Sequence, residues 1–492
     1  MTTQLTPDTA SSLFETQQDK AATLRKLCGG AVSLPGDPGY DAARQPWNVA
    51  FDQRPAAVAY PASAEEAAEV VCAAAAAGLR VAPQSTGHNS GPLVEGGLDD
   101  VVLLRTSAMT SVEIDPERRM ATVGGGVLWG DVVEAAAAHG LDALHGSSPD
   151  VGVSGYSLGG GIGWFARKLG LQTNSITGAT VVTADGQIRR VDAKSEPEMF
   201  WALRGGGGNV GVVTSLEFRL YPIDSAYGGM LAWDWSRAEE VLTRWAAWAV
   251  DAPDEVTTSF RILQLPPLPE IPEPIRGRNL VMIDGAVLAD DSRAEEILAP
   301  LRELEPEIDT FGRVPAVALT RIHGDPEGPT PGVSDSAMLG ALTADAIRAF
   351  VDAAGPGSGS TLLAAELRQL GGQLGRPQAG AGALPKLDGQ FVLFGVGFAI
   401  TPEMGAQASV DARRLMAALR PWSNGRKYLN FAESAVDPST GYASADFARL
   451  QAVRAAVDPN GLSVANHRVP VAASEPAASR PSQLERMVPQ PR

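Results

Sequence analysis

A single histidine stands in a glycine- and serine-rich stretch in the first fifth of the chain. Residues 84–92 read QSTGHNSGP, and His88 is one of only 5 histidines among 492 residues. Small, flexible residues on both sides make a place in a hydrophobic core improbable. A turn histidine that is hydrogen-bonded to the backbone is the structural alternative, so a functional role needs support from other parts of the sequence.

A second stretch of the same kind, GSSPDVGVSGYSLGGGIG, runs from residue 146 to 163. Glycines let backbone N–H groups approach an anion closely, and hydroxyl side chains add further donors. Either stretch alone is best explained as an ordinary flexible turn. Together, in a chain without internal repeats, they favour a cradle for the pyrophosphate of a cofactor. Its candidate residues are Gly87, Gly91, Gly152, Gly155, Gly159, Gly160 and Gly161, with Ser85, Thr86, Ser147, Ser148 and Ser154.

A third glycine pattern needs a different interpretation. Gly206, Gly208 and Gly211 match the dinucleotide fingerprint G-x-G-x-x-G. That fingerprint works between a strand and a following helix, where the pyrophosphate meets the helix N-terminus. Here a helical pattern precedes the glycines and a β-like run follows them, with no suitable acidic residue downstream. We therefore exclude a Rossmann domain.

The elements expected around the first loop are mixed α and β. A helix is predicted over 63–78, with Ser63 and Glu66 as a capping box and Gly78 in the left-handed position after its end. The segment LRVAP at 79–83 should be the strand that leads into the His88 loop. Two more strands are expected at VVLLR (101–105) and MATVGGG (120–126).

Further along, a second helix is expected to end at Gly140, and residues 146–163 are expected to form a loop without regular structure. A strand pair with an Asp185–Gly186 turn should follow, then a helix capped by Ser195 and Glu198. After Pro222 the glycine motifs stop and proline-rich stretches such as LQLPPLPEIPEPIRG appear. We therefore predict a second domain over 227–420 and a disordered tail from Ala472.

The overall composition is that of a globular protein, with 44% hydrophobic and 20% charged residues. A formal net charge of −17 argues against nucleic acid and anionic membrane as partners, because the field of the protein repels both. The two cysteines, Cys28 and Cys72, allow no zinc ribbon or disulfide framework, and Cys72 is expected as a buried apolar residue of a helix. The first 20 residues lack the pattern of a secretory signal, so we expect a soluble, cytoplasmic protein without a metal centre.

Three long stretches carry a family resemblance: VAPQSTGHNSG, GSSPDVGVSGYSLGGGIGWFARKLGLQTNSITGATVVTADGQI and MFWALRGGGGNVGVVTSLEFRLYPI. The segments YDAARQPWNVAFDQRPAAVAYPASAEEAAEVV, KYLNFAES and ADFARLQAVRAAVDPNGLSVANHRV add to it. In this combination the sequence resembles the FAD-linked oxidases of the vanillyl-alcohol oxidase superfamily, and within it the berberine-bridge-enzyme-like branch. The resemblance covers roughly residues 40–469 and is weakest in the middle of the chain.

The resemblance implies an α+β fold of two domains. A PCMH-type FAD-binding domain, made of two α+β subdomains, is expected at 47–222 after an N-terminal extension at 1–46. A substrate domain, with an antiparallel sheet flanked by helices, is expected at 223–420. Residues 421–470 should return to the FAD domain, and 471–492 form the disordered tail.

The resemblance also implies that FAD is attached covalently, from a ring nitrogen of His88 to the 8α-methyl of the flavin. Neutral imidazole is a nucleophile near physiological pH, and the alkylated ring should raise the reduction potential of the flavin. Many relatives carry a second link from a cysteine in G-x-C-x-x-V-G-x-G/S-G, but Ser148 stands at that position. A hydroxyl is a poor nucleophile beside a thiolate, so we predict one covalent bond and a reduction potential below that of doubly linked relatives. The implied cofactor contacts are His88, Gln84, Ser85, Thr86, Gly87, Asn89, Ser90, Ser148, Val151, Gly152, Gly155, Gly159, Gly160, Val213 and Asn430.

For proton transfer, the resemblance implies Tyr428 of the YLN motif, with Asn430 holding the flavin or the tyrosine. A phenol is a weak base unless its pKa falls from ~10, so a neighbour must stabilise the phenolate. A packed strand tyrosine is the structural alternative, and Glu433 is a second candidate base. His323, Glu366 and Arg368 lie in the least similar region; a surface position is expected for each, with a place in the substrate pocket as the alternative.

These observations predict an FAD-dependent oxidoreductase that acts on a small organic substrate such as an alcohol, an amine, a sugar or a natural-product intermediate. Hydride would pass to the flavin N5, with dioxygen as the acceptor that gives hydrogen peroxide. The competing hypothesis is a non-catalytic binding module that retains the FAD cradle. Retention of His88 together with the YLN motif favours the enzyme, because a binding module needs neither.

Overall fold

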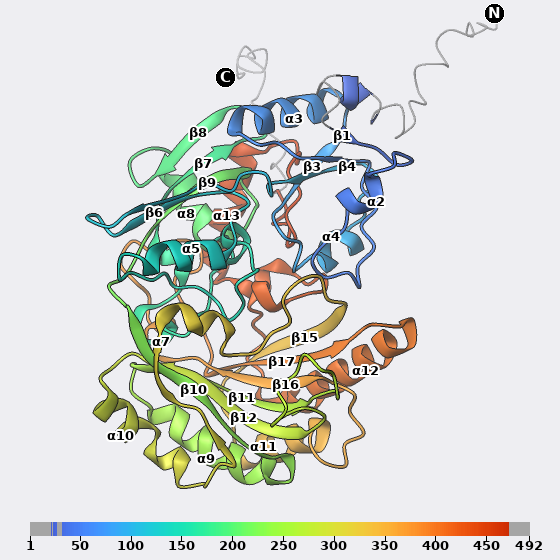
Figure 1. The fold of residues 1–492 in the computed structure, drawn as a ribbon. Coiled ribbons are helices and arrows are strands. Elements are labelled where there is room, and N and C mark those ends of the chain that lie inside the picture. The colour runs from blue at the N-terminus through green and yellow to red at the C-terminus, as the bar shows by residue number, and fades with distance from the viewer. Residues whose placement is uncertain (1–20, 22, 27–31, 472–492) are drawn as a thin grey trace, which may run out of the picture.

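The structure, a computed structural model, describes residues 21, 23–26 and 32–471. These residues form three β-sheets (Figure 1). Two smaller sheets with their helices occupy the upper half of the view, and one large sheet with helices below it occupies the lower half. The predictions about Cys28, about a signal segment in the first 20 residues and about the tail from Ala472 lie outside the described residues.

The first sheet has the strand order β1-β2-β4-β3, in which β2, β4 and β3 run parallel and β1 is antiparallel. Its parallel strands are almost fully buried, which explains apolar runs such as VVLLR. The Ser63 hydroxyl accepts a hydrogen bond from the Glu66 N–H at 3.2 Å, and Gly78 has a φ of +66°, so the predicted helix ends are confirmed. The elements are β1 Val32–Ser33, α2 Tyr40–Ala43, β2 Ala57–Ala59, α3 Ala64–Ala76, β3 Arg80–Gln84, α4 Gly91–Glu95 and β4 Val101–Arg105.

The second sheet is antiparallel, in the order β5-β6-β9-β7-β8. The predicted Asp185–Gly186 turn joins β7 to β8, with Gly186 at a φ of +74°. Gly140, with a φ of +65°, follows α5 as expected. The elements are β5 Val112–Asp115, β6 Met120–Gly124, α5 Trp129–Ala137, α6 Val153–Leu158, α7 Ala166–Leu169, β7 Ile176–Val182, β8 Ile188–Asp192, α8 Pro197–Gly206 and β9 Val212–Arg219.

Three local predictions were wrong. The 146–163 stretch is not irregular throughout, because α6 forms inside it and ends where Gly160 and Gly161 take positive φ values. Ser195 does not cap α8; Glu196, at a φ of +56°, is the N-cap residue and no side chain caps the helix. Cys72 is exposed rather than buried, since alanine on most of α3 leaves little apolar pattern to tell its faces apart.

The third sheet is antiparallel and has eight strands, in the order β13-β10-β12-β11-β16-β17-β15, with β14 also pairing with β10. Helices α9, α10, α11 and α12 cover one face (Figure 1). The elements are β10 Ser225–Asp234, α9 Ala238–Asp251, β11 Val256–Gln264, β12 Asn279–Val287, α10 Asp291–Arg302, β13 Ile308–Asp309, β14 Gly312–Pro315, β15 Gly332–Leu339, α11 Ala344–Ala354, β16 Ala364–Gln369, β17 Phe391–Phe398 and α12 Pro402–Leu419.

Strand alternation gives this sheet two different faces. On β11, Phe260 and Ile262 pack into the core under the helices, whereas Arg261 and Leu263 point to the opposite face. That opposite face is directed at the two smaller sheets. The large sheet therefore forms a wall opposite the loops of the first half of the chain.

The last part of the chain returns to the first half. Val81 of β3 exchanges backbone hydrogen bonds with Leu462 and Val464, each at 2.8 Å. Helix α13, Ser444–Val457, packs on α8, where Arg449 pairs with Glu198 at 2.8 Å. The predicted α+β class and the antiparallel sheet with flanking helices are confirmed, while the domain boundaries at 222 and 420 stay predictions. No helix within the described residues has the length and apolar character to cross a membrane.

Candidate active site

One large cavity lies between the loops of the first half and the open face of the large sheet. Its volume is about 1190 Å³. It brings together most of the residues singled out in the sequence: Gln84, Ser85, Thr86, Gly87, His88, Asn89, Ser148, Val151, Gly152, Gly155, Gly159, Val213, Tyr428, Asn430 and Glu433. Ser90, Gly91, Gly160 and Gly161 do not line it. Ser90 is fully buried ahead of α4, and Gly160 lies behind Tyr428, where an added Cβ would come within 3.2 Å of the phenol oxygen.

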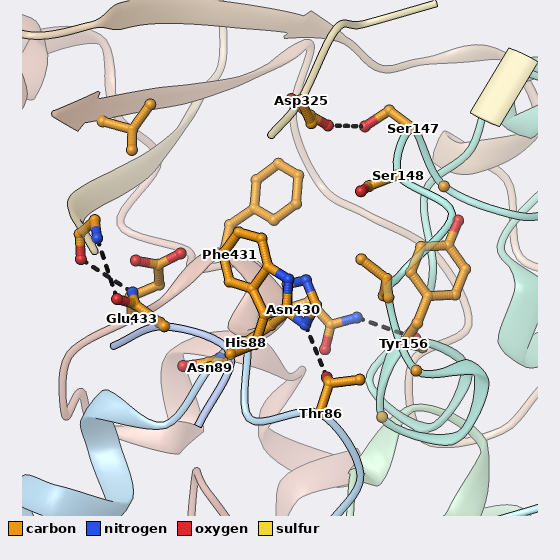
Figure 2. Close-up of a pocket in the computed structure, with 18 of the residues that line it drawn as sticks. Thr86, His88, Asn89, Ser147, Ser148, Tyr156, Asp325, Asn430, Phe431 and Glu433 are labelled. Carbon is orange, nitrogen blue, oxygen red and sulfur yellow. Dashed lines mark hydrogen bonds between the residues drawn. The ribbon is translucent and has the colours of Figure 1, made fainter. Parts of the chain in front are cut away.

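His88 is held on three sides (Figure 2). Its loop starts where β3 ends. Gly87 takes a φ of +83°, which favours glycine, and a Cβ at this position would also lie only 2.8 Å from Pro46. The Trp47 ring stacks on the imidazole, with centroids 4.0 Å apart and planes inclined by 15°. Thr86 Oγ1 hydrogen-bonds His88 Nδ1 at 2.7 Å. The other ring nitrogen, Nε2, is buried without a hydrogen-bond partner.

Asp150 lies next to this histidine, with Oδ1 3.7 Å from His88 Nε2. Its carboxylate accepts hydrogen bonds from Trp47 Nε1 at 2.6 Å, Ser148 Oγ at 2.8 Å and the Gly328 N–H at 2.7 Å. Burial raises the pKa of Asp150, but the interactions with His88, Gly328, Trp47 and Ser148 outweigh it and hold the pKa well below the ordinary value of 3.8. Asp150 is therefore ionised at neutral pH.

The glycine-rich stretches provide open backbone at the cavity. An added Cβ on Gly155 would meet nothing within 4 Å, so α6 presents bare backbone to the cavity at that point. Buried polar atoms without partners gather around the same space, namely Ser85 Oγ, Asn89 Oδ1, Ser154 Oγ and His467 Nδ1. Buried polar groups normally have partners, so these atoms fit a polar group such as FAD in the cavity.

The segment 205–209 also lines the cavity, although its G-x-G-x-x-G match carries no Rossmann context. A helix, α8, precedes it and a strand, β9, follows it, so the exclusion of that motif is confirmed. Asn209 fixes the segment by donating to Gly206 O at 2.8 Å and to His467 O at 3.1 Å. Because the dinucleotide fingerprint was excluded, residues 205–209 were not among the predicted site residues. The run of four glycines nevertheless indicates a third loop at the cavity.

Tyr428 is buried, and its oxygen accepts hydrogen bonds from the Gly161 N–H at 2.8 Å and from Asn430 Nδ2 at 3.3 Å. Asn430 also donates to Tyr156 O at 3.0 Å (Figure 2). Burial raises the pKa of Tyr428 to about 12, and the donors Gly161 and Asn430 lower it by less. Tyr428 is therefore a neutral phenol at pH 7, and the phenolate that a tyrosine base needs is not favoured here.

Glu433, five residues after Tyr428, lines the same cavity. Burial raises the pKa of its carboxyl to about 7, with a smaller lowering effect from Ser334. A group with a pKa near the working pH exchanges protons readily in both directions. Of the two sequence candidates for a base, Glu433 is the one whose protonation state changes near neutral pH.

The expected surface positions of His323, Glu366 and Arg368 were wrong. Their exposed fractions are 7%, 4% and 9%, and all three line the cavity. Arg368 Nε donates to Glu366 Oε1 at 2.6 Å, and His323 Nδ1 is 2.8 Å from Asp284 Oδ2. Burial lowers the pKa of His323, but Asp284 and the other nearby carboxylates raise it to about 9. Charged side chains usually face water, and nothing in the linear sequence indicates that these three neutralise one another inside the molecule.

Within the described residues, no group of three or more His, Cys, Asp or Glu side chains is placed to hold a metal ion. Other cavity residues were not singled out from the sequence. Trp47, Tyr156 and His467 come from three separate segments that meet only in the folded chain.

Comparisons with known proteins find an FAD binding domain and relatives that are named oxidases. Residues 55–192 match the model of an FAD binding domain. The chain is 39% identical over 205 residues to (R)-6-hydroxynicotine oxidase of Paenarthrobacter nicotinovorans, covering 42% of this chain and 44% of that protein. It is 35% identical over 206 residues to xylooligosaccharide oxidase of Thermothelomyces thermophilus, covering 41% of each. The matched stretches thus span less than half the length of these two curated relatives.

The solved structures match over nearly the whole chain. The BBE-like 1 protein of Physcomitrella patens has a TM-score of 0.79 at 19% identity, covering 91% of this chain and 99% of that chain. The 6-hydroxy-D-nicotine oxidase of Arthrobacter nicotinovorans has a TM-score of 0.77 at 27% identity, covering 88% of this chain and 95% of that chain. Residues 55–192 thus match an FAD binding domain, and the fold of the chain is similar to those of the BBE-like 1 protein and of 6-hydroxy-D-nicotine oxidase.

Proposed function

We propose that this protein is an FAD-dependent oxidase that carries its flavin covalently on His88 and oxidises a small organic molecule. The observation that carries the proposal is that one cavity contains His88 and the glycine-rich loops together with Tyr428 and Asn430, which pack on the second loop, and Glu433. A binding module would need the loops alone. The relatives with oxidase names support the same class of reaction.

The loops at 84–89, 146–159 and 205–209 are the parts of the chain that would hold FAD. Ser85, Asn89 and Ser154 have buried polar atoms to offer it, and Gly155 offers backbone without a side chain in the way. When bound, the flavin supplies a two-electron acceptor for a hydride from a C–H bond next to oxygen or nitrogen. The chain's own task is to hold the substrate there and to take up its proton.

For that proton we assign Glu433 as the acceptor and Tyr428 as a hydrogen-bond donor. Because the pKa of Glu433 is about 7, a large fraction of it is carboxylate at neutral pH. The Tyr428 oxygen already accepts from Gly161 and Asn430, which leaves its own hydrogen for an oxygen or nitrogen of the substrate. This assignment places the carboxylate ahead of the tyrosine that the sequence resemblance suggested first.

The substrate would lie against the open face of the large sheet. That wall combines apolar side chains, among them Met230, Leu263 and Val396, with the ionised Glu366 and Arg368. Such a wall fits a small molecule with both apolar and polar parts. The named substrates of the two relatives, a hydroxynicotine and a xylooligosaccharide, fall in the classes of amine and sugar, which are therefore tested together with alcohols.

Peroxide release tests the proposal. Purified protein is incubated aerobically with panels of alcohols, cyclic amines and oligosaccharides, and hydrogen peroxide is measured with a coupled peroxidase assay. The expected result is release by the wild type with at least one class, and a large loss in Glu433→Gln. A yellow protein that stays oxidised with every panel, both in air and under anaerobic titration, would favour the non-catalytic module instead.

A further inference from the structure

Asp150 joins three separate segments of the chain beside His88. Its donors come from Trp47 in the entry segment, from Ser148 in its own loop and from Gly328 in the loop before β15. Trp47 is in turn fixed by that loop, because its carbonyl accepts from the Thr330 N–H at 3.1 Å. An ionised carboxylate with three hydrogen-bond donors has little freedom to move, so its position relative to His88 is set by the fold.

The two nitrogens of His88 face different partners. Nδ1 is 2.7 Å from the Thr86 hydroxyl, which can either donate or accept. Nε2 is 3.7 Å from Asp150 Oδ1, which can only accept while it is ionised. At 3.7 Å the carboxylate is beyond hydrogen-bond distance, but its negative charge favours a proton on Nε2, in which case the Thr86 hydroxyl can donate to the lone pair on Nδ1.

We propose that Asp150 is a positioning residue for flavin attachment: it keeps the proton of His88 on Nε2 and orients the ring, so that the Nδ1 lone pair is free to bond to the flavin 8α carbon. The inference rests on the covalent anchor proposed above and goes beyond it by naming the nitrogen and the group that selects it. Thr86 has a small side chain at the surface of the cavity, and rotation of its hydroxyl uncovers Nδ1.

Atoms and electrons balance in the attachment reaction with only the flavin, His88 and dioxygen as reactants. One bond forms, between His88 Nδ1 and the 8α carbon; the methyl group loses one proton, and the imidazole loses its Nε2 proton. The two electrons of the broken C–H bond stay with the flavin, and dioxygen removes them as hydrogen peroxide. As the histidine nitrogen becomes alkylated, positive charge develops on the ring, and the carboxylate next to Nε2 stabilises it and accepts its proton.

The same geometry gives Ser148 a task. Its hydroxyl donates to Asp150 Oδ1 at 2.8 Å, the oxygen that faces His88. Many relatives carry a second residue that links to the flavin at this position. In this chain, Ser148 instead holds the Asp150 carboxylate beside His88, the single proposed linking residue.

The test measures attachment separately from turnover. Wild type, Asp150→Asn, Asp150→Ala, His88→Ala and the control Asp99→Asn, an exposed carboxylate in the first half of the chain, are produced as full-length apoprotein from riboflavin-depleted cells. FAD is added in air, the total bound flavin is measured by fluorescence, and the covalent fraction is followed by intact mass after denaturation. For Asp150→Ala the time course is repeated with formate, and with chloride at the same ionic strength.

We expect all these variants to bind FAD, with Asp150→Asn and Asp150→Ala gaining covalent mass at least ~10-fold more slowly than wild type and Asp99→Asn. Formate, but not chloride, should accelerate attachment in Asp150→Ala, an effect that a merely structural role would not give. Attachment at the wild-type rate in Asp150→Asn would overturn the inference and leave the His88 anchor standing. Wild type that binds FAD but never gains its mass would overturn both.

Discussion

At the scale of single residues, the site depends on groups whose charge states are set by burial. Tyr428 and Glu433 both line the cavity, and burial raises the pKa of Tyr428 to about 12 and that of Glu433 to about 7. Only the second value allows the residue to change its protonation state near neutral pH. The two side chains should therefore contribute to turnover in different ways, and substitution separates them.

Substitution of Glu433 by Gln should lower kcat by about 10²- to 10⁴-fold, because the proton acceptor is lost. In the wild type, kcat should rise with pH through about 7, as Glu433 becomes ionised, and this rise should disappear in the variant. Tyr428→Phe should lower kcat but retain the rise. Steady-state kinetics from pH 5 to 9 measure both; a Glu433→Gln profile with the same inflection would rule out Glu433 as the base.

The same carboxyl should affect stability with a defined sign. Its folded-state pKa of about 7 exceeds the ordinary 4.5, so the folded chain binds this proton more tightly than the unfolded chain. The free energy of unfolding should therefore fall as the pH rises from about 4.5 to 7 on account of this group. Glu433→Gln should melt higher than wild type at pH 8 and equally at pH 4, whereas exposed Glu113→Gln should match wild type at both.

Ser148 offers a gain-of-function test of the single anchor. It lines the cavity together with His88, at the position where the family motif has cysteine. Ser148→Cys combined with His88→Ala should recover a covalently bound flavin, because a thiolate replaces a hydroxyl. Intact mass of the double variant, compared with that of His88→Ala alone, measures this covalent link. If neither protein gains the mass of FAD, residue 148 does not lie close enough to the flavin to bond to it.

At the scale of elements, α6 shows how a short helix can serve two purposes. Gly155 faces open space in the cavity, whereas a Cβ on Gly159 would overlap the Asn430 side chain. Gly155→Ala should leave the apoprotein's melting temperature unchanged but weaken FAD binding, since the methyl group enters the cofactor space. Gly159→Ala should lower the melting temperature as well, because Asn430 must move away from Tyr428. Thermal melts with and without FAD measure the difference.

Element positions were predictable where local rules decide them. The Ser63 cap and the turn at Gly186 follow from residue chemistry alone, and both were found, although the Glu66 carboxylate accepts from the Ala62 N–H rather than from the Ser63 N–H of a capping box. Helix α6 was missed because its residues, VSGYSL, carry weak helix propensity, and tertiary packing of Val153 and Leu158 stabilises it instead. The failed Ser195 cap has a local cause: the Asp192 carboxylate accepts from the Ser195 backbone N–H at 2.8 Å, and the N-cap position of α8 falls on Glu196 instead.

At the scale of the whole molecule, the two halves are joined by a buried arginine. Arg167 of α7 is 3% exposed and donates to the carbonyl oxygens of Ala252, Pro253, Val256 and Leu370 at 2.7–3.0 Å. All four acceptors belong to the half that contains the large sheet. The site between the halves therefore depends on a contact distant from the cofactor loops.

Arg167→Met should lower the free energy of unfolding by at least about 3 kcal/mol, because buried carbonyls lose their donors. The matched control is the neighbouring Lys168, which is exposed and donates from Nζ to Leu288 O at 2.9 Å. Lys168→Met should change the free energy of unfolding by less than about 0.5 kcal/mol. Urea unfolding followed by tryptophan fluorescence compares the two. Equal midpoints would show that the buried arginine does not hold the halves together.

The cofactor side of the cavity could be predicted because its residues lie in contiguous loops, 84–90 and 146–163. The substrate side could not, because Arg261 of β11 and the pair Glu366 and Arg368 of β16 meet only through the register of the sheet. Glu366 pairs with Arg368 on its own strand and Arg261 pairs with Asp284 of β12, and no linear pattern reveals that these ion pairs are buried. The family resemblance was enough to predict the fold, whereas the residues on the large-sheet side of the cavity could be identified only from the structure.

Intact mass and the absorption spectrum, before and after acid precipitation, test the central claim most directly. For the wild type we predict a yellow pellet and the added mass of one FAD, and for His88→Ala the loss of that mass with FAD-binding capacity retained. Asp99→Asn should behave as wild type. Yellow colour released into the supernatant, with no added mass on the wild-type chain, would contradict the covalent anchor, and a chain that takes up no FAD at all would contradict the account as a whole.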